Sequence, residues 1–378
     1  MRTLYELQGI LHESHLLDKT MPLRARYAGA VQNERVREIL DLETPPITDL
    51  TGVLGIENGG CVYAVRMDLN KGADNHKKLV VAGLILRGVL QARIPKEEID
   101  TFIDGGSFNS ASAVKYYADR FGMKGAYVMS GRLPQHVTDL LESDNFKVIR
   151  APYLYDNKRE KEFYVHLFGL MQKREFSKNK YCLWHVKYGG EVMYPIGRQI
   201  SENLKGVPDY VVSCVGAGST LEGLQIAIQD HFKEKRTKTT PKIIIAEHEL
   251  SPLFAKHLPM RSAGSKPHSL EGVVVEELYY PAKEVPHIVI GPHYDEINPL
   301  LSRDSIDRID SAVQFSEYDW KGTQQYLLAR GLSVGNSSAA NISVAARLAN
   351  EGKKVVTVIF EPFREFYRKR EETGIPLV

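Results

Sequence analysis

Short apolar segments alternate with segments of helical periodicity along most of this chain, and the alternation restricts the folds that the chain can adopt. The clearest apolar segments are Tyr127–Met129, Tyr210–Val215, Ile243–Ala246 and Val355–Phe360. Between them, apolar residues recur at three- and four-residue steps, as in the stretch 111–121. Short buried strands that alternate with amphipathic helices form parallel-rich sheets covered by helices. The sequence therefore predicts an α/β fold.

Length and charge restrict the function further. The chain of 378 residues is long enough for roughly two or three folding units. Its 49 Lys and Arg residues nearly balance its 47 Asp and Glu residues, which leaves a net charge of +2. Such a balance gives no support to binding of nucleic acid or of a membrane surface. We therefore expect the partner to be a small molecule.

Cysteine usage and the N-terminal residues bear on the compartment. The three cysteines, Cys61, Cys182 and Cys214, are too few and too scattered for a disulfide framework or a zinc site. The first residues lack the pattern of a secretory signal, and no stretch has the ~20 apolar residues that span a bilayer. We expect a cytoplasmic protein without a bound metal.

Two breaks in the pattern predict the domain organisation. Charged helical residues 1–43 form an N-terminal extension that ends before Thr44-Pro45-Pro46, where two prolines begin an extended segment. A second break lies in the region of a charge run at 158–162 and the pair Gly189-Gly190. We therefore expect an N-terminal α/β domain over 44–195 and a C-terminal α/β domain over 196–378.

A glycine-rich turn is the most informative local feature. The apolar segment before Gly216 runs into Gly216-Ala217-Gly218-Ser219-Thr220, and a helical pattern follows. Free N–H groups at a helix start, together with the helix dipole, bind anions such as phosphate. A dinucleotide fingerprint would need a third glycine, but Leu221 stands there, and the acid that closes the next strand, Glu247, lies 31 residues after Gly216. These two departures weaken the case for a nicotinamide cofactor without excluding it.

Two further polar segments precede helical patterns. Ser107-Phe108-Asn109-Ser110 begins an amphipathic helix, where small hydroxyl residues and an amide either cap the helix or bind an anion such as a carboxylate. The polar loop around Lys77 opens onto the apolar run 79–86. Lys77 lies 32 residues before Asn109, and Asn109 lies 107 residues before Gly216.

In this order, the lysine loop, the Ser-x-Asn helix start and the glycine-rich turn resemble pyridoxal-phosphate enzymes of the tryptophan synthase β-subunit fold (fold type II). Within them the resemblance is to the branch of cysteine synthase and cystathionine β-synthase. It extends from about Thr44 to Tyr367. It implies two α/β/α domains with parallel-rich sheets and pyridoxal 5′-phosphate in the cleft between them.

The resemblance assigns roles to the residues that bind the cofactor. Lys77 matches the Schiff-base lysine, although the Asp-Arg that commonly follows it is Lys78-Leu79 here. Asn109 matches the residue that hydrogen-bonds the phenolic oxygen of the cofactor. The turn Gly216, Ala217, Gly218, Ser219 and Thr220 matches the phosphate cradle.

Other positions depart from the family pattern. Glu361 stands where a Ser or Thr usually faces the pyridine nitrogen, and a carboxylate there would favour the protonated ring. A solvated acid at the end of the strand is the alternative. Ser107, Phe108 and Ser110 match the loop that takes the substrate carboxylate, with Phe108 in place of a glycine. His185 falls near a substrate-side Gln of cysteine synthases, with a structural histidine as the alternative.

The resemblance implies β-replacement on a serine- or cysteine-like amino acid through an aminoacrylate, with Lys77 as the base. If water reacts in place of the nucleophile, the outcome is β-elimination. The resemblance also implies a homodimer. Three alternatives stay open: a deaminase or dehydratase with the same cofactor, a nicotinamide-dependent oxidoreductase, and a binding protein that has kept only the phosphate cradle.

Overall fold

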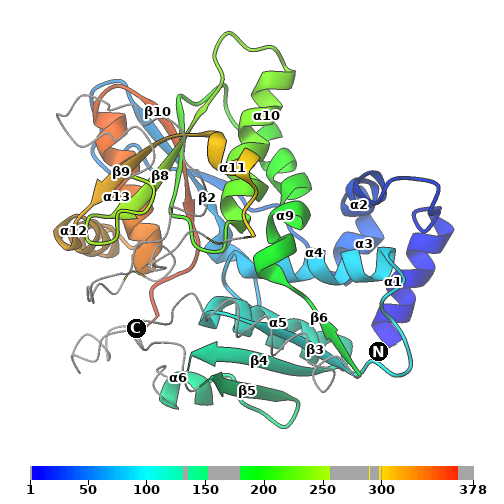
Figure 1. Ribbon diagram of the computed structural model, residues 1–378. Coiled ribbons are helices and arrows are strands. Elements are labelled where there is room, and N and C mark those ends of the chain that lie inside the picture. The colour runs from blue at the N-terminus through cyan, green and yellow to red at the C-terminus, as the bar shows by residue number, and fades with distance from the viewer. Residues whose placement is uncertain are drawn as a thin grey trace. The chain divides into compact units, whose positions relative to one another are not determined.

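The protein is described by a computed structural model in which residues 2–130, 135–151, 179–255, 289, 298 and 300–364 are placed (Figure 1). The chain divides into two compact units. Unit 1 consists of Met1–Glu43 and Asn70–Pro195, and unit 2 consists of Thr44–Leu69 and Ile196–Val378. Both are α/β units with parallel-rich sheets, so the predicted fold class is confirmed.

Unit 1 is built on a four-stranded sheet whose pairings are all parallel. Its order is β5-β4-β3-β6. The bounds of these strands are β3 Thr101–Gly105, β4 Lys124–Ser130, β5 Phe146–Ala151 and β6 Lys180–Cys182. The helices that belong wholly to this unit are α1 Arg2–Glu13, α2 Leu23–Gln32, α3 Glu34–Ile39, α4 Lys77–Leu90, α5 Phe108–Phe121 and α6 Gln135–Asp139. Helix α5 packs against β3 and β4 (Figure 1).

Helices α4 and α5 form where the sequence pattern requires them. The apolar stripe of α5 faces the sheet, and Gly122 ends this helix in the left-handed conformation at φ 62°, which suits a glycine. Helix α4 is buried along its whole length, as expected of a helix that is apolar on nearly every side. It therefore forms the core of unit 1.

The N-terminal segment is helical, as predicted, but it is an integral part of unit 1. Helices α1 and α2 contact α4. The buried Arg26 donates to the Leu90 carbonyl at 2.7 Å, and the Tyr27 hydroxyl donates to the Val192 carbonyl at 2.9 Å. These bonds satisfy polar groups inside the unit.

Unit 2 contains a six-stranded sheet in the order β1-β2-β10-β7-β8-β9, in which only the β1–β2 pairing is antiparallel. The strands are β1 Ile47–Asp49, β2 Cys61–Arg66, β7 Tyr210–Ser213, β8 Lys242–His248, β9 Ile309–Phe315 and β10 Lys354–Ile359. The helical elements are η1 Met67–Leu69, η2 Leu221–Gln225, α10 Ile226–Glu234, α11 Arg303–Asp307, α12 Glu317–Leu328 and α13 Asn336–Asn350. Asn341 of α13 accepts from the Cys214 N–H at 2.7 Å and donates to the Val358 carbonyl at 3.1 Å, which joins the helix to two neighbouring strands.

The structure differs from the predicted domain boundaries at two places. Residues 44–69 were expected in the N-terminal domain, but they belong to unit 2 because β2 pairs with β10 along its full length. The pair Gly189-Gly190 is no linker, since it lies inside α9 His185–Glu202, a helix that passes from unit 1 into unit 2 after Pro195. The charge run at 158–162 lies outside the described residues.

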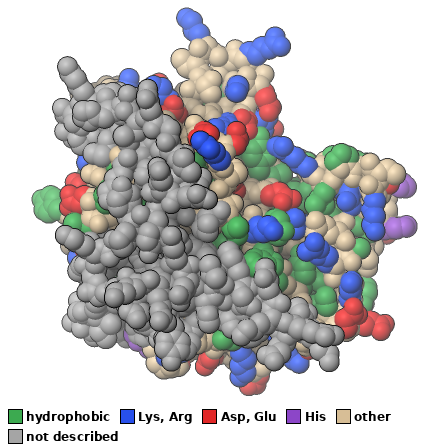
Figure 2. Space-filling model, in the orientation of Figure 1, with side chains coloured by type: hydrophobic (Ala, Val, Ile, Leu, Met, Phe, Trp, Pro, Cys, Tyr) green, Lys and Arg blue, Asp and Glu red, His purple; other side chains and the backbone are tan. Residues whose placement is uncertain are grey.

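The helices and the surface charge of the described residues agree with the composition of the chain. Within the placed residues, no helix combines the length and apolarity needed to cross a bilayer. On the face shown in Figure 2, basic and acidic side chains are interspersed over the described surface. This distribution agrees with the small net charge of the whole chain.

Candidate active site

In unit 1, the carboxyl ends of the parallel strands bring several predicted residues together. The Gly106 N–H, directly after β3, donates to the Val128 carbonyl of β4 at 2.9 Å, and the Leu183 N–H after β6 donates to the Ile103 carbonyl at 2.9 Å. The chain then enters α5 and α9 at Phe108 and His185. Ligands of open α/β sheets bind at this edge, so it is the candidate site of the unit.

Lys77 is a buried amine at the first position of α4. Its side chain lies among buried residues with 7% of its surface exposed, and its backbone N–H donates to the Asn75 side-chain oxygen at 2.8 Å. Burial lowers the pKa of Lys77 to about 8, and the nearby Asp104 carboxylate opposes this effect. An amine with such a pKa is partly neutral near pH 7, which a nucleophile or a base requires.

The neighbouring lysine has a structural role. The Lys78 ammonium lies 2.5 Å from the Asp41 carboxylate and 5.2 Å from the centre of the Tyr116 ring. Only 2% of its surface is exposed. Lys78 therefore links α4 to the N-terminal helices, whereas Lys77 lies beside Asp104.

The start of α5 holds four of the predicted residues. Ser107 is the N-cap residue, and the buried Ser110 donates its hydroxyl to the Ser107 carbonyl at 3.1 Å, so this hydroxyl is engaged within the helix. Phe108 is buried. The side-chain oxygen of Asn109 is buried and has no hydrogen-bond partner among the described residues.

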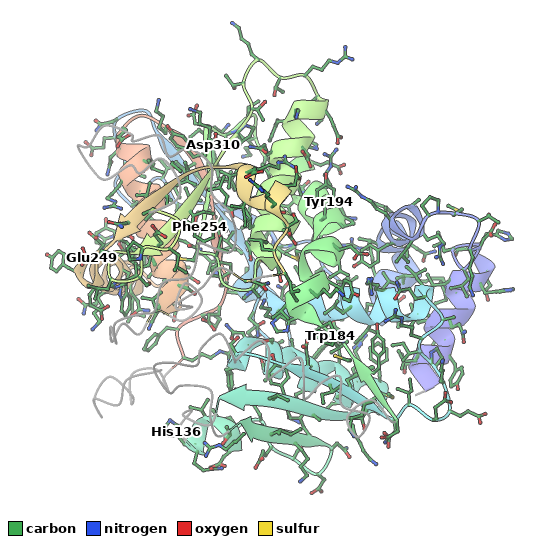
Figure 3. The ribbon with its side chains drawn as sticks, viewed as in Figure 1. His136, Trp184, Tyr194, Glu249, Phe254 and Asp310 are labelled. Atoms are coloured by element: carbon green, nitrogen blue, oxygen red, sulfur yellow. The ribbon has the colours of Figure 1, made fainter. Side chains whose placement is uncertain are left out.

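His185 forms a buried pair with Asp104, an acid to which the sequence analysis assigned no role. The Nδ1 atom of His185 lies 3.0 Å from Oδ2 of Asp104, and both side chains are nearly inaccessible to solvent. Trp184, labelled in Figure 3, lies between β6 and α9 directly before this histidine. A sequence signal did exist, because Asp104 is a carboxylate inside an apolar strand.

In unit 2, the glycine-rich turn follows β7 as predicted. The backbone becomes helical at Ser219 and continues through η2 and α10. Gly218 has φ +91°, and a Cβ atom there would lie 2.6 Å from Cδ1 of Leu301, so only glycine fits. The Ser219 hydroxyl oxygen is buried and has no hydrogen-bond partner in the described part of the chain. The turn thus offers a helix start and a buried hydroxyl.

Glu361 follows β10 and is buried, with 4% of its surface exposed. A solvated strand-end acid is therefore the wrong interpretation of this residue. Its backbone carbonyl accepts from the Gly335 N–H at 2.9 Å, and a Cβ atom on Gly335 would lie 2.6 Å from Cγ of Glu361. The glycine before α13 therefore makes room for this carboxylate.

A family model covers the part of the chain that contains the candidate site residues. The family described as "Pyridoxal-phosphate dependent enzyme" matches residues 43–361, and the chain belongs to this family. Pyridoxal 5′-phosphate is therefore its cofactor. No curated protein matches the chain.

Solved structures with the same fold are distant in sequence. An O-ureido-L-serine synthase is 16% identical with a TM-score of 0.66, and the match covers 90% of this chain and 96% of that one. A cysteine synthase from Entamoeba histolytica is 17% identical with a TM-score of 0.64, covering 91% and 90%. An O-acetylserine-dependent cystathionine β-synthase from Helicobacter pylori is 20% identical with a TM-score of 0.61, covering 89% and 97%. At these identities the likeness establishes the fold alone.

The residues present fit the cofactor of the family. Asn109 in unit 1 and Ser219 in unit 2 each bury a polar oxygen without a partner among the described residues. Buried polar groups are normally hydrogen-bonded, and an unsatisfied one costs about 1–3 kcal/mol. At either place, a bound ligand that hydrogen-bonds the atom would remove this cost. Within the described residues, no cluster of His, Cys, Asp and Glu could hold a metal ion.

Proposed function

We propose that this enzyme catalyses β-replacement on a serine- or cysteine-like amino acid, in the manner of cysteine synthases. The observation that carries the proposal is the buried amine of Lys77, whose pKa is lowered to about 8. The bound cofactor supplies an aldehyde that reacts with amines and a ring that accepts electrons. Lys77 would hold this cofactor covalently and then, as a free amine, take the proton from Cα of the substrate.

The other residues have binding roles in this proposal. The turn Gly216–Thr220 binds the 5′-phosphate through its N–H groups and the hydroxyls of Ser219 and Thr220. Asn109 binds the cofactor ring, and Glu361 faces the pyridine nitrogen. Ser107 and Phe108 lie where the substrate carboxylate binds, at the N-terminal end of α5.

Three structural relatives support the choice of reaction. They are an O-ureido-L-serine synthase, an O-acetylserine-dependent cystathionine β-synthase and a cysteine synthase. All three names include an amino acid substituted at Cβ. This shared feature favours replacement over a deaminase or dehydratase activity. The nicotinamide alternative is removed by the family match, since that family depends on pyridoxal phosphate.

We further propose a cytoplasmic homodimer that acts on a small molecule and not on nucleic acid. The net charge of +2 supports the choice of partner, and the free thiols of Cys61, Cys182 and Cys214 support the compartment. The homodimer rests on the resemblance to the family. Light scattering coupled to size-exclusion chromatography measures the oligomeric state directly.

The activity is tested with a panel of serine derivatives that carry different groups on Cβ, each supplied with sulfide or a small thiol. Mass spectrometry should show a new amino acid with the thiol on Cβ, and the variant Lys77→Ala should lack this activity. Formation of a keto acid and ammonia, unaffected by added thiol, would instead establish elimination.

A further inference from the structure

The paired side chains of Asp104 and His185 form a buried acid–base group beside Lys77. Asp104 has no exposed surface, and 3% of His185 is exposed. Oδ2 of Asp104 accepts from the backbone N–H of His185 at 3.2 Å and lies 3.0 Å from its ring Nδ1. Oδ1 of Asp104 accepts from the Gly105 N–H at 2.9 Å. The carboxylate is thus fixed at the carboxyl end of β3.

These contacts determine which ring nitrogen of His185 is available for proton transfer. A carboxylate that already accepts backbone N–H groups is an acceptor, so Nδ1 of His185 carries a proton and donates it. The other nitrogen, Nε2, is left to exchange a proton with a ligand. When Nε2 also carries a proton, the Asp104 carboxylate lies directly against the ring, as in an Asp–His pair of a hydrolase.

The surroundings place Nε2 at the predicted substrate loop. A Cβ atom on Gly106 would lie 3.0 Å from Cε1 and 3.5 Å from Nε2 of His185, so the ring lies directly against the glycine that precedes Ser107. Gly106 has φ +144°, which lets the loop approach the ring this closely. The hydroxyl of Tyr127 lies at the same point, 3.2 Å from the Cβ position.

Two further titratable groups belong to this cluster, both at the start of α4. Asp104 acts electrostatically on Lys77. Burial, together with the charges of Lys77 and His185, lowers the pKa of His76 well below its ordinary value, so His76 is neutral at pH 7. Because His76 is neutral and Lys77 serves as the base at Cα, His185 is the group best placed to act as an acid.

We propose that His185, held by Asp104, protonates the group that leaves Cβ, and that the natural substrate therefore carries a poor leaving group such as a hydroxyl or an amine. The proposal rests on the β-replacement proposed above. A hydroxide or an amide ion leaves carbon only with a proton, whereas chloride leaves without one. A site built for good leaving groups alone would have no use for this acid.

The step balances in protons and electrons. Lys77 takes the proton from Cα, the electron pair of that bond forms the Cα–Cβ double bond, and the bond from Cβ to the leaving group breaks. The leaving group receives the proton from Nε2 of His185. When the nucleophile adds to Cβ, it returns a proton to Nε2, and Lys77 returns its proton to Cα.

The test compares two donors in the holoenzyme, L-serine and β-chloro-L-alanine, with the variant His185→Gln. General acid catalysis is worth about 10²–10⁴ in rate, so we expect kcat/KM for L-serine to fall at least about 100-fold and that for β-chloro-L-alanine by less than about threefold. The exposed His136 provides the matched control, and His136→Gln should leave both donors unchanged. Asp104→Asn should reproduce the selective loss because it disturbs the orientation of the ring.

Each outcome decides the proposal. An equal loss with both donors, or no loss, would show that His185 is structural. Wild-type turnover of β-chloro-L-alanine but not of L-serine overturns this proposal and leaves the proposed function standing. If neither these donors nor any serine derivative of the panel is turned over, both proposals are overturned. Nitrogen NMR of the labelled holoenzyme, with His185→Gln for assignment, should show the proton of the neutral ring on Nδ1. A neutral ring with its proton on Nε2 would also overturn the proposal.

Discussion

Replacing Lys77 by Met should stabilise the apoprotein, the form that lacks the cofactor. Desolvation lowers the pKa of Lys77 from 10.5 to about 8, and a difference of this size corresponds to about 3 kcal/mol. At pH 7 the amine is mainly protonated in both states, so the folded state bears this cost in full. Met has a similar length and no charge. The free energy of unfolding should therefore rise by up to about 3 kcal/mol at pH 7.

The pH dependence of the stability difference between wild type and Lys77→Met is a second test of the sign of this effect. Between pH 8 and 10.5 the unfolded chain holds the Lys77 proton and the folded chain does not, so wild-type stability rises with pH relative to that of the variant. The advantage of Lys77→Met should be largest below pH 8. It should shrink steadily through this window and vanish near 10.5.

Urea unfolding of the two apoproteins at pH 7, 9 and 10, followed by circular dichroism, measures these differences. Lys78→Met is the matched control, because it removes an ammonium 2.5 Å from Asp41 and leaves the partly buried carboxylate of Asp41 without this partner. We expect this control to lose roughly 2 kcal/mol at pH 7. The reasoning would be refuted if Lys77→Met were less stable than wild type at pH 7. It would also be refuted if the difference in the free energy of unfolding between the two did not change with pH.

Three further outcomes test the proposed cofactor site. Borohydride reduction of the purified protein should abolish a visible absorption band, and peptide mapping should place the pyridoxyl group on Lys77; its presence on Lys78 would contradict the assignment. Gly218→Val should weaken cofactor retention at least tenfold in a fluorescence titration, since the new side chain meets Leu301 in a left-handed backbone, and unchanged affinity with an intact fold would place the phosphate elsewhere. Glu361→Gln should alter the pH dependence and absorption spectra of turnover while the cofactor stays bound, and unchanged spectra and turnover would remove Glu361 from the site.

The sequence predicted the secondary structure well where the local pattern of apolar residues decides it. The expected strands at 127–129, 210–215, 243–246 and 355–360 correspond to β4, β7, β8 and β10. These segments are apolar because their strands are buried on both faces, and such a signal is local. The start of α5 after Ser107 and the glycine-rich turn before Ser219 were also predictable, because short runs of neighbouring residues determine them.

Strand pairing was beyond the reach of the sequence. Residues 44–69 lie between the two segments of unit 1 in the chain, but β2 pairs with β10, whose partner residues lie almost 300 positions further along. No local pattern encodes such a pairing. Likewise, Gly189-Gly190 resembled a linker, yet the packing of α9 overrides the low helix propensity of glycine.

The sequence by itself determined the α/β class, the glycine-rich turn between β7 and a helix, and the family, because spacing and glycine placement carry these features. The resemblance selected Lys77 over Lys78, but only the tertiary structure showed how their surroundings differ: Lys77 is buried near Asp104, and Lys78 pairs with Asp41. The tertiary structure also joined Asp104 to His185, 81 positions apart in the chain, and buried Glu361 against Gly335. Desolvation and hydrogen bonding arise from neighbours that are distant in sequence, so the charge state and the orientation of a side chain become defined only when the chain folds.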